Sequence, residues 1–202
     1  MEHQCHCKKN CKTQSLAVMR ILLLVIISIY LIACEPLLPQ KVIDGKAELI
    51  DSSVDWSEHG RTNSEQRFSP LKNINRDTVA KLGLHWSYEF DTARGQEATP
   101  LAVNGVIYTT TAWSKVFAFD GVTGELLWSY DPKVPGEAAS KGCCDVVNRG
   151  AAYSDGRVFV GTFDGRLIAL DANTGELLWS TLTVDPSKPY TISGAPRTAK
   201  GK

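Results

Sequence analysis

The sequence has no excess of charge of either sign. Its 202 residues hold 22 Lys and Arg against 22 Asp and Glu. Proteins that bind nucleic acid usually carry a basic excess, so this balance argues against a nucleic-acid partner. Histidine is scarce as well, and His59 and His85 lack the spacing of metal ligands. We expect both to be structural or exposed.

The sequence also has no apolar run of the length of an ordinary membrane span. The run at residues 21–33 has thirteen residues, whereas a transmembrane helix needs roughly 20. Arg20 precedes this run and the small Ala33 ends it, which is the layout of a secretory signal. We therefore expect residues 1–33 to be a signal peptide.

The end of the apolar run resembles the lipobox of bacterial lipoproteins. The letters "LIAC" place Cys34 where such proteins carry the acylated first residue. The resemblance implies lipidation of Cys34, a linker over residues 34–54 and a periplasmic protein anchored to a membrane. Glu35 favours the outer membrane by the same resemblance. A plain signal peptide and an uncleaved anchor are the alternatives.

The first residues are rich in metal-ligating types, namely His3, Cys5, His6, Cys7 and Cys11. They precede an export signal and would be discarded with it. Met19 would begin a shorter signal. We interpret residues 1–18 as an extension from a start codon assigned too early, or as a segment without a role.

Processing at Cys34 would leave two further cysteines, the adjacent Cys143 and Cys144. An oxidising compartment favours disulfides, and each of the two has only its neighbour as an intramolecular partner. Adjacent Cα atoms lie closer than the roughly 4.4–6.8 Å of ordinary disulfides. The bond would be strained, and strain gathers at functional sites. From the residues alone, a disulfide and two reduced core cysteines remain equally open.

A repeat of 51 residues organises the rest of the chain. The letters "TGELLW" at Thr123–Trp128 recur at Thr174–Trp179, and a period of this length indicates propeller blades or arrays. Hairpin-turn dipeptides separate short β-rich runs, at 104–105, 155–156 and 164–165. Each unit therefore predicts four antiparallel strands, the blade of a β-propeller. The Asp, Thr, Gly and Trp of the motif are interpreted as scaffold.

The predicted fold is all-β, an incomplete β-propeller of about two and a half four-stranded blades over residues 55–202. We expect blades near 98–130 and 149–182, the latter with strands near 150–154, 157–163, 166–171 and 176–182. A third blade is expected to begin at Ser193. Residues 77–82 predict a helical turn, and residues 84–90 a lone strand that closes the ring. Further blades are expected in the same protein or in a split partner.

Five stretches together resemble the N-terminal region of the quinoprotein alcohol dehydrogenases, which use pyrroloquinoline quinone (PQQ) and include methanol and ethanol dehydrogenases. They are "DWSEHGRTNSEQRFSPL" at 55–71, "GQEATP" at 95–100, "GCCDVVNRG" at 142–150 and the two Trp motifs. The resemblance implies an eight-bladed propeller that oxidises primary alcohols to aldehydes by hydride transfer to PQQ. It implies a Ca²⁺ or lanthanide ion and a cytochrome c-type electron acceptor.

The resemblance implies cofactor contacts for Glu97, Cys143, Cys144, Arg149 and Ser193. A Cys143–Cys144 disulfide would stack on one face of PQQ, and Arg149 would bind its quinone oxygens or carboxylates. Ser193 keeps a hydroxyl where the family commonly has Thr. Glu97 would hydrogen-bond PQQ if neighbouring cations or protons balance its charge. The alternatives are a capping carboxylate for Glu97 and a solvated turn arginine for Arg149.

The catalytic base and the metal ligands of this family lie in later blades. We therefore expect no catalytic and no metal-ligating residue in this chain, and no alcohol oxidation by the chain alone. A second interpretation is a non-catalytic propeller lipoprotein that serves as an outer-membrane assembly scaffold. The lipobox fits it, but such a scaffold has no need of the cysteine pair with "QEATP".

Overall fold

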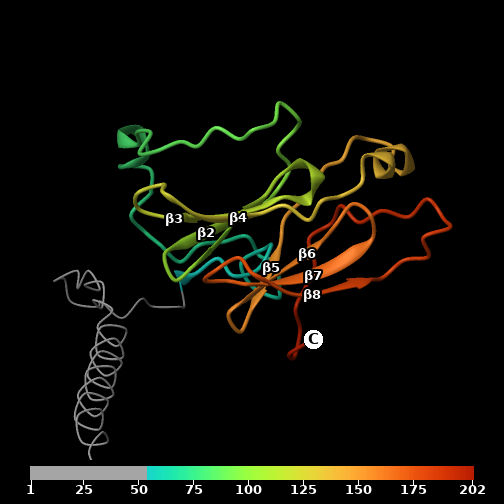
Figure 1. The fold of residues 1–202 in the computed structure, drawn as a ribbon. Helices are drawn as coiled ribbons and strands as arrows, with labels where there is room; N and C mark the ends of the chain where they lie inside the picture. The colour runs from blue at the N-terminus through green and yellow to red at the C-terminus, as the bar shows by residue number, and fades with distance from the viewer. Residues whose placement is uncertain (1–53) are drawn as a thin grey trace, which may run out of the picture. The chain divides into compact units, whose positions relative to one another are not determined.

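The protein is described from a computed structural model, in which residues 54–202 are placed (Figure 1). The predicted signal peptide, the lipidation of Cys34 and the linker up to residue 53 lie outside the described residues. Within residues 54–202, no helix combines the length and the apolar character that crossing a membrane requires.

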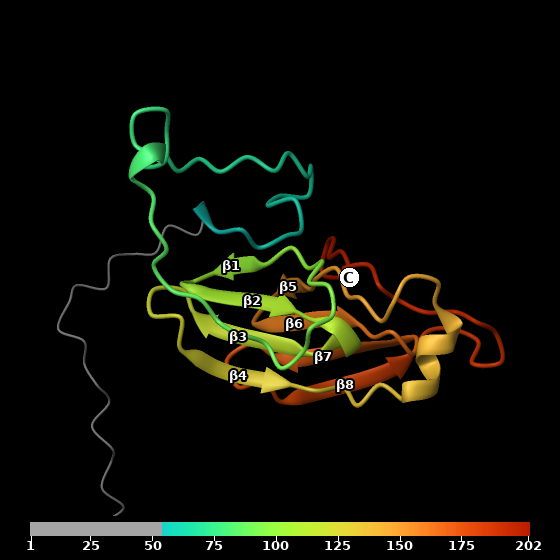
Figure 2. The same ribbon diagram turned by 90° about the horizontal axis from the view of Figure 1, so that it is seen from above.

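Two four-stranded antiparallel sheets form the framework of the described chain (Figure 2). The first has the order β1-β2-β3-β4, with strands Leu101–Val103, Val106–Thr110, Val116–Asp120 and Leu126–Tyr130. The second has the order β5-β6-β7-β8, with strands Ala152–Ser154, Arg157–Gly161, Arg166–Asp171 and Leu177–Leu182. The prediction of four-stranded antiparallel blades is confirmed.

The first hairpin of each sheet turns at the dipeptide that the sequence marks. Asn104 and Gly105 have φ values of 50° and 78°, and Asp155 and Gly156 have 48° and 72°. Two positive φ angles in succession match a type I′ turn, whose twist suits the flanking strands. The register of each hairpin follows, with Val103 opposite Val106 in the first sheet.

The turn between the third and fourth strand is built by the repeated Asp, Thr and Gly. The Asp120 carboxylate accepts hydrogen bonds from the backbone N of Val122 at 2.9 Å and of Thr123 at 2.7 Å. Thr123 also donates its hydroxyl to Asp120, and these bonds hold the pKa of Asp120 below its ordinary value. Asp171 forms the equivalent bonds in the second sheet, so the motif is local scaffold.

The repeated Trp joins one sheet to the next. Trp128 of β4 is almost fully buried, and its Nε1 donates to the Ala172 backbone oxygen at 2.9 Å. Its ring covers Gly175, where an added Cβ would lie 2.6 Å from Cε3 of the ring. The aliphatic core between the two sheets surrounds this contact, with Val116, Val158, Ile168 and Leu170 fully buried. Packing between blades therefore depends on a flat ring against a glycine.

Residues 84–90 differ from the prediction. They form no β-ladder with any described strand. A β-strand needs a hydrogen-bonded neighbour on at least one edge, and among the described strands this segment has none. Their aromatic side chains still alternate onto one face, and Tyr88 and Phe90 pack at 4.7 Å and 4.9 Å, centroid to centroid, from Phe119 and Phe117 of β3. Nearby, a short 3₁₀ helix, η2 at Val79–Lys81, lies within the predicted helical turn.

Candidate cofactor-binding site

Three segments that precede or begin successive blades lie side by side. Thr99 N donates to the Arg149 backbone oxygen at 3.3 Å, and Arg149 N donates to the Ser193 backbone oxygen at 2.9 Å. Thr99 and Gly150 form a parallel bridge. Gly150 has a φ of 126°, and a Cβ there would approach the Thr99 oxygen to 3.0 Å, so a glycine allows this close approach. The described residues 193–202 form no strand.

The Arg149 side chain connects two other predicted cofactor residues. Its Nη2 lies 2.9 Å from Oε2 of Glu97, and its Nη1 donates to the Ser193 hydroxyl at 2.7 Å. The side chains of Arg149 and Glu97 are 45% and 42% exposed. The cluster is therefore open on one side. The Arg149 cation offsets the negative charge of Glu97, as the predicted position of Glu97 beside an anionic cofactor requires.

Cys143 and Cys144 are joined by a disulfide, with their Cα atoms 3.8 Å apart. This separation is below the usual range for disulfides. Both residues are exposed, unlike a pair of core cysteines. They follow the 3₁₀ helix η4, Gly136–Lys141, after the single residue Gly142. The bond therefore presents two linked sulfur atoms at the surface.

A small apolar cluster supports the start of the disulfide loop. Phe163, Val146, Ala112 and Ala138 are all buried in it. The Phe163 ring lies so close to Gly142 that any Cβ at this position would collide with it. The chain entering the disulfide therefore lies directly on a buried aromatic ring.

The residue after the disulfide is also fixed. Asp145 has a φ of 75°, and its Oδ1 accepts a hydrogen bond from Val146 N at 2.8 Å. The same oxygen forms an ion pair with Nη1 of Arg94, whose guanidinium carbon lies 5.5 Å from the centre of the Trp113 ring. Asp145 therefore connects the disulfide loop to the loop that bears Glu97.

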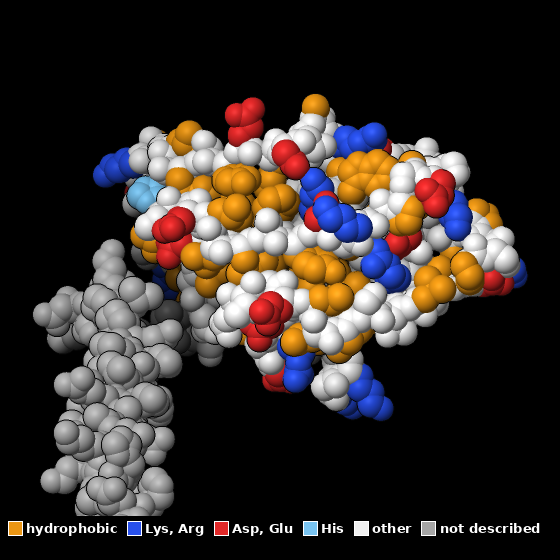
Figure 3. All heavy atoms as spheres, in the orientation of Figure 1, with side chains coloured by type: hydrophobic (Ala, Val, Ile, Leu, Met, Phe, Trp, Pro, Cys, Tyr) orange, Lys and Arg blue, Asp and Glu red, His pale blue; other side chains and the backbone are white. Residues whose placement is uncertain are grey.

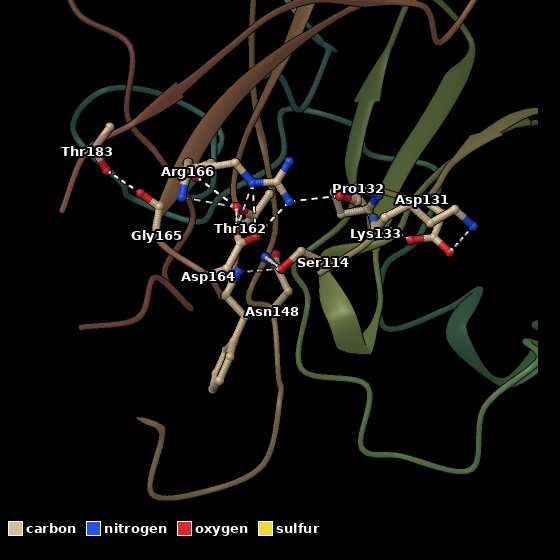
Figure 4. A network of polar contacts seen from close by, with 11 residues as sticks. Ser114, Asp131, Pro132, Lys133, Asn148, Thr162, Asp164, Gly165, Arg166 and Thr183 are labelled. Carbon is tan, nitrogen blue, oxygen red and sulfur yellow. Dashed lines mark hydrogen bonds and ion pairs between the residues drawn. The ribbon is translucent and has the colours of Figure 1, made fainter. Parts of the chain in front are cut away.

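Sequence reasoning missed Asn148, the buried residue next to Arg149 (Figure 4). Its Oδ1 accepts from the Thr110 hydroxyl at 2.7 Å and from Gly150 N at 3.0 Å. Its Nδ2 donates to the Gly161 oxygen at 2.8 Å and to the Ser114 hydroxyl at 3.3 Å. One amide thus joins both sheets at the residue before the exposed arginine. The only sequence signal for it is a polar residue that follows two valines.

A second link between the sheets lies in the same network (Figure 4). Arg166 donates to the Pro132 backbone oxygen at 2.8 Å and forms an ion pair with Asp164 at 2.8 Å. Burial alone would raise the pKa of Asp164, but the hydrogen bonds from Arg166 and Thr162 outweigh this effect, so the pKa lies below its ordinary value. The β6–β7 turn is thereby held against the loop after β4.

The two histidines that the sequence predicts to be structural or exposed, His59 and His85, lie apart from this cluster. His85 is exposed, and one of its ring nitrogens lies 2.9 Å from the Val122 oxygen. His59 is half-buried, and burial, followed by the charge of Arg197, lowers its pKa. Among residues 54–202, no group of three or more His, Cys, Asp and Glu is placed to hold a metal ion.

Two hollows of the surface lie elsewhere. One, of about 500 Å³, is lined by Phe117 and Tyr130 on the face of the first sheet. The other, of about 250 Å³, is lined by Phe159 and Trp179 on the second. Figure 3 shows hydrophobic side chains exposed between charged ones on the viewed face. The lining of neither hollow includes a predicted cofactor residue, so both are features of the open sheet faces.

The two sheets have the same strand order, and the Trp128 ring of the first packs on Gly175 of the second. These are the features of a β-propeller whose blades share a Trp motif. The sequence profile described as "Glucose/ethanol/alcohol dehydrogenase, beta-propeller domain" matches residues 56–180. The chain belongs to this PQQ family, and the resemblance to quinoprotein alcohol dehydrogenases is confirmed.

The relatives extend well beyond this chain. It is 61% identical over 154 residues to the dehydrogenase subunit of the quinone alcohol dehydrogenase of Gluconobacter oxydans, with 73% of this chain and 20% of that protein covered. It is 52% identical over 149 residues to the 1-butanol dehydrogenase (cytochrome c) of Thauera butanivorans, covering 73% and 22%. A europium-containing methanol dehydrogenase matches in structure with a TM-score of 0.70 and 38% identity, covering 74% and 27%. The chain thus spans about a fifth of the length of these curated relatives.

Proposed function

We propose that this chain is part of an exported, PQQ-dependent alcohol dehydrogenase and that it supplies one side of the PQQ site. The observation that carries the proposal is the cluster of Arg149, Glu97 and Ser193 next to the loop with the exposed Cys143–Cys144 disulfide. Membership of the family and 61% identity to a quinone alcohol dehydrogenase subunit support it.

The cluster fits the chemistry of PQQ, a flat ortho-quinone with three carboxylates. The paired sulfurs offer a rigid, polarisable plate for one face of the ring. Arg149 offers a guanidinium, which pairs well with a carboxylate or a quinone oxygen. The Ser193 hydroxyl and the Glu97 carboxylate offer one donor and one acceptor, and the Arg149 charge offsets that of Glu97. When bound, PQQ supplies the acceptor for the hydride.

The remaining chemistry belongs to parts of the protein beyond these residues. A Ca²⁺ or lanthanide ion would polarise the quinone carbonyl, and a carboxylate would take the proton of the alcohol. The europium in one structural neighbour and the cytochrome c in the name of one relative support a metal ion and a cytochrome c-type acceptor. We further propose a primary alcohol as the substrate and a lipid-anchored periplasmic location, with the outer membrane favoured.

A chimera tests the proposal at the scale of a whole enzyme. Residues 56–202 replace the matching segment of the Gluconobacter oxydans subunit, to which this chain is 61% identical. We expect the chimera to bind PQQ and to oxidise ethanol with a dye acceptor. The 202-residue chain with PQQ and Ca²⁺ serves as the comparison and should give no turnover.

Variants of the chimera assign the roles. Arg149→Met removes the guanidinium proposed to pair with PQQ, a charged contact worth about 1.5–3 kcal/mol, and should weaken PQQ binding at least tenfold. Arg197→Met is the matched control, since Arg197 is 44% exposed and its ion pair is with Glu65, which is not a predicted cofactor residue. A chimera that folds but binds no PQQ would contradict the proposal and favour the non-catalytic scaffold.

A further inference from the structure

Two ion pairs of opposite polarity join the same two segments of chain. Arg94 pairs with Asp145, and three residues later Glu97 pairs with Arg149. The backbone bridge between Thr99 and Gly150 continues this alignment. The cation comes first on one segment and the anion first on the other, so a shift of register would bring like charges together. The alignment fixes where the disulfide loop lies relative to Glu97.

Arg94 makes contacts on more than one side. Its guanidinium lies 5.5 Å from the Trp113 ring centre, within the range of a cation–π contact. Trp113 N donates to the Val146 oxygen at 2.9 Å, so the ring is itself tied to the residue that follows Asp145. The backbone N of Arg94 donates to the Thr92 hydroxyl at 3.2 Å, which orders the backbone around Arg94.

The disulfide itself lies between two anchors. Gly142 on one side is pressed against Phe163, and Asp145 on the other is held by Arg94. The first anchor belongs to the disulfide's own blade, and the second belongs to the loop that leads to Glu97. Arg94 is therefore the side chain that ties the plate of sulfurs to the rest of the cluster.

We propose that Arg94 is a positioning residue for the Cys143–Cys144 disulfide, acting through Asp145 and Trp113. The use of the disulfide as a surface for PQQ rests on the proposed function, but the positioning itself does not. The two claims therefore need separate readouts, namely the reactivity of the disulfide and the affinity for PQQ.

The first readout is the rate at which dithiothreitol reduces the disulfide in the 202-residue chain. Dithiothreitol is oxidised to its cyclic disulfide, and Cys143 and Cys144 become thiols. Alkylation followed by mass spectrometry of the peptide that holds this pair counts them apart from the four other cysteines of the chain. Loosening the loop lets the two sulfurs separate more easily once a thiolate attacks the bond. Arg94→Met and Asp145→Asn should each speed reduction roughly two- to fivefold, the range expected for loss of one exposed ion pair.

Charge alone predicts a different pattern. Removing the Arg94 cation would make thiolates near it less stable and slow reduction, whereas removing the Asp145 anion would speed it. Faster reduction in Arg94→Met therefore supports positioning, and slower or unchanged reduction overturns it. Arg94→Lys retains a cation for the single contact to Asp145 and should restore a rate near wild type. Arg197→Met is the control and should leave the rate unchanged.

Salt gives the same test without a substitution. At 1 M NaCl the screening length falls to about 3 Å, which should speed reduction of the wild-type chain more than that of Arg94→Met. An equal effect on both would contradict the proposal. The second readout is PQQ affinity in the chimera, which Arg94→Met should weaken about two- to fivefold. If the unaltered chimera binds no PQQ, the proposed function fails, while the disulfide rates still decide the role of Arg94.

Discussion

Replacement of Gly175 by alanine tests how the blades are joined. Gly175 has a φ of 74°, and an added Cβ would lie 2.6 Å from Cε3 of Trp128. The ring has little room to move, because it is 8% exposed and its Nε1 donates to the Ala172 oxygen at 2.9 Å. We therefore expect Gly175→Ala to strain both the turn and the contact between sheets.

Backbone strain and overpacking against the ring each contribute to the expected loss of stability, and a second glycine separates the two. A left-handed conformation costs an alanine roughly 1–2 kcal/mol, and overpacking of a filled site adds about 1–3 kcal/mol. Gly156 has nearly the same φ, 72°, but a Cβ there would meet nothing within 4 Å. Gly156→Ala should thus lose only the conformational part, and Gly175→Ala should lose both, roughly 2–5 kcal/mol.

The assay is urea unfolding of the 202-residue chain and its variants, followed by tryptophan fluorescence and circular dichroism. Gly175→Ala should be less stable than Gly156→Ala by at least about 1 kcal/mol. Replacing Trp128 by leucine as well should make the two changes less than additive. Equal losses in the two glycine variants would refute the idea that the ring needs a glycine beneath it.

Three further predictions concern buried polar groups. Asn148→Ala should cost about 2–4 kcal/mol in urea unfolding, because it leaves buried donors and acceptors of both sheets unpaired; the exposed Asn173→Ala is the control. Asp164→Asn should lower stability at pH 7 and make stability fall less steeply below about pH 4. The lowered pKa of Asp164 stabilises the fold above the unfolded pKa, and acid removes this stabilisation. Burial raises the pKa of Tyr108 to about 12, so stability should fall as the pH rises from about 10 towards 12, and Tyr108→Phe should reduce this fall.

The scaffold was predictable because its contacts are short-range in sequence. Asp120 bonds residues two and three positions further on, and Asn104 with Gly105 closes a hairpin of adjacent strands. Such bonds depend on residue types at fixed spacing, which a repeat makes visible. The period of 51 residues then implies the same bonds in both sheets, as Asp171 shows.

The contacts that hold the candidate site together depend instead on residues far apart in the chain. Asn148 bonds Thr110, 38 residues away, and Arg94 pairs with Asp145, 51 residues away. Neither partner can be inferred from spacing or polarity before the blades are stacked. The segment 84–90 shows the converse, since its alternating aromatics indicate an extended chain but not which strand, if any, pairs with it.

A titration of PQQ into the chimera, beside Cys143→Ala/Cys144→Ala in the same protein, tests most directly whether this chain provides a face of the cofactor site. We predict one PQQ per chimera and clearly weaker binding once the two sulfurs are removed, while thermal unfolding shows that both proteins remain folded. Equal affinity for PQQ with and without the sulfurs would contradict the assignment of the disulfide, and no binding by either folded protein would contradict the assignment of the site.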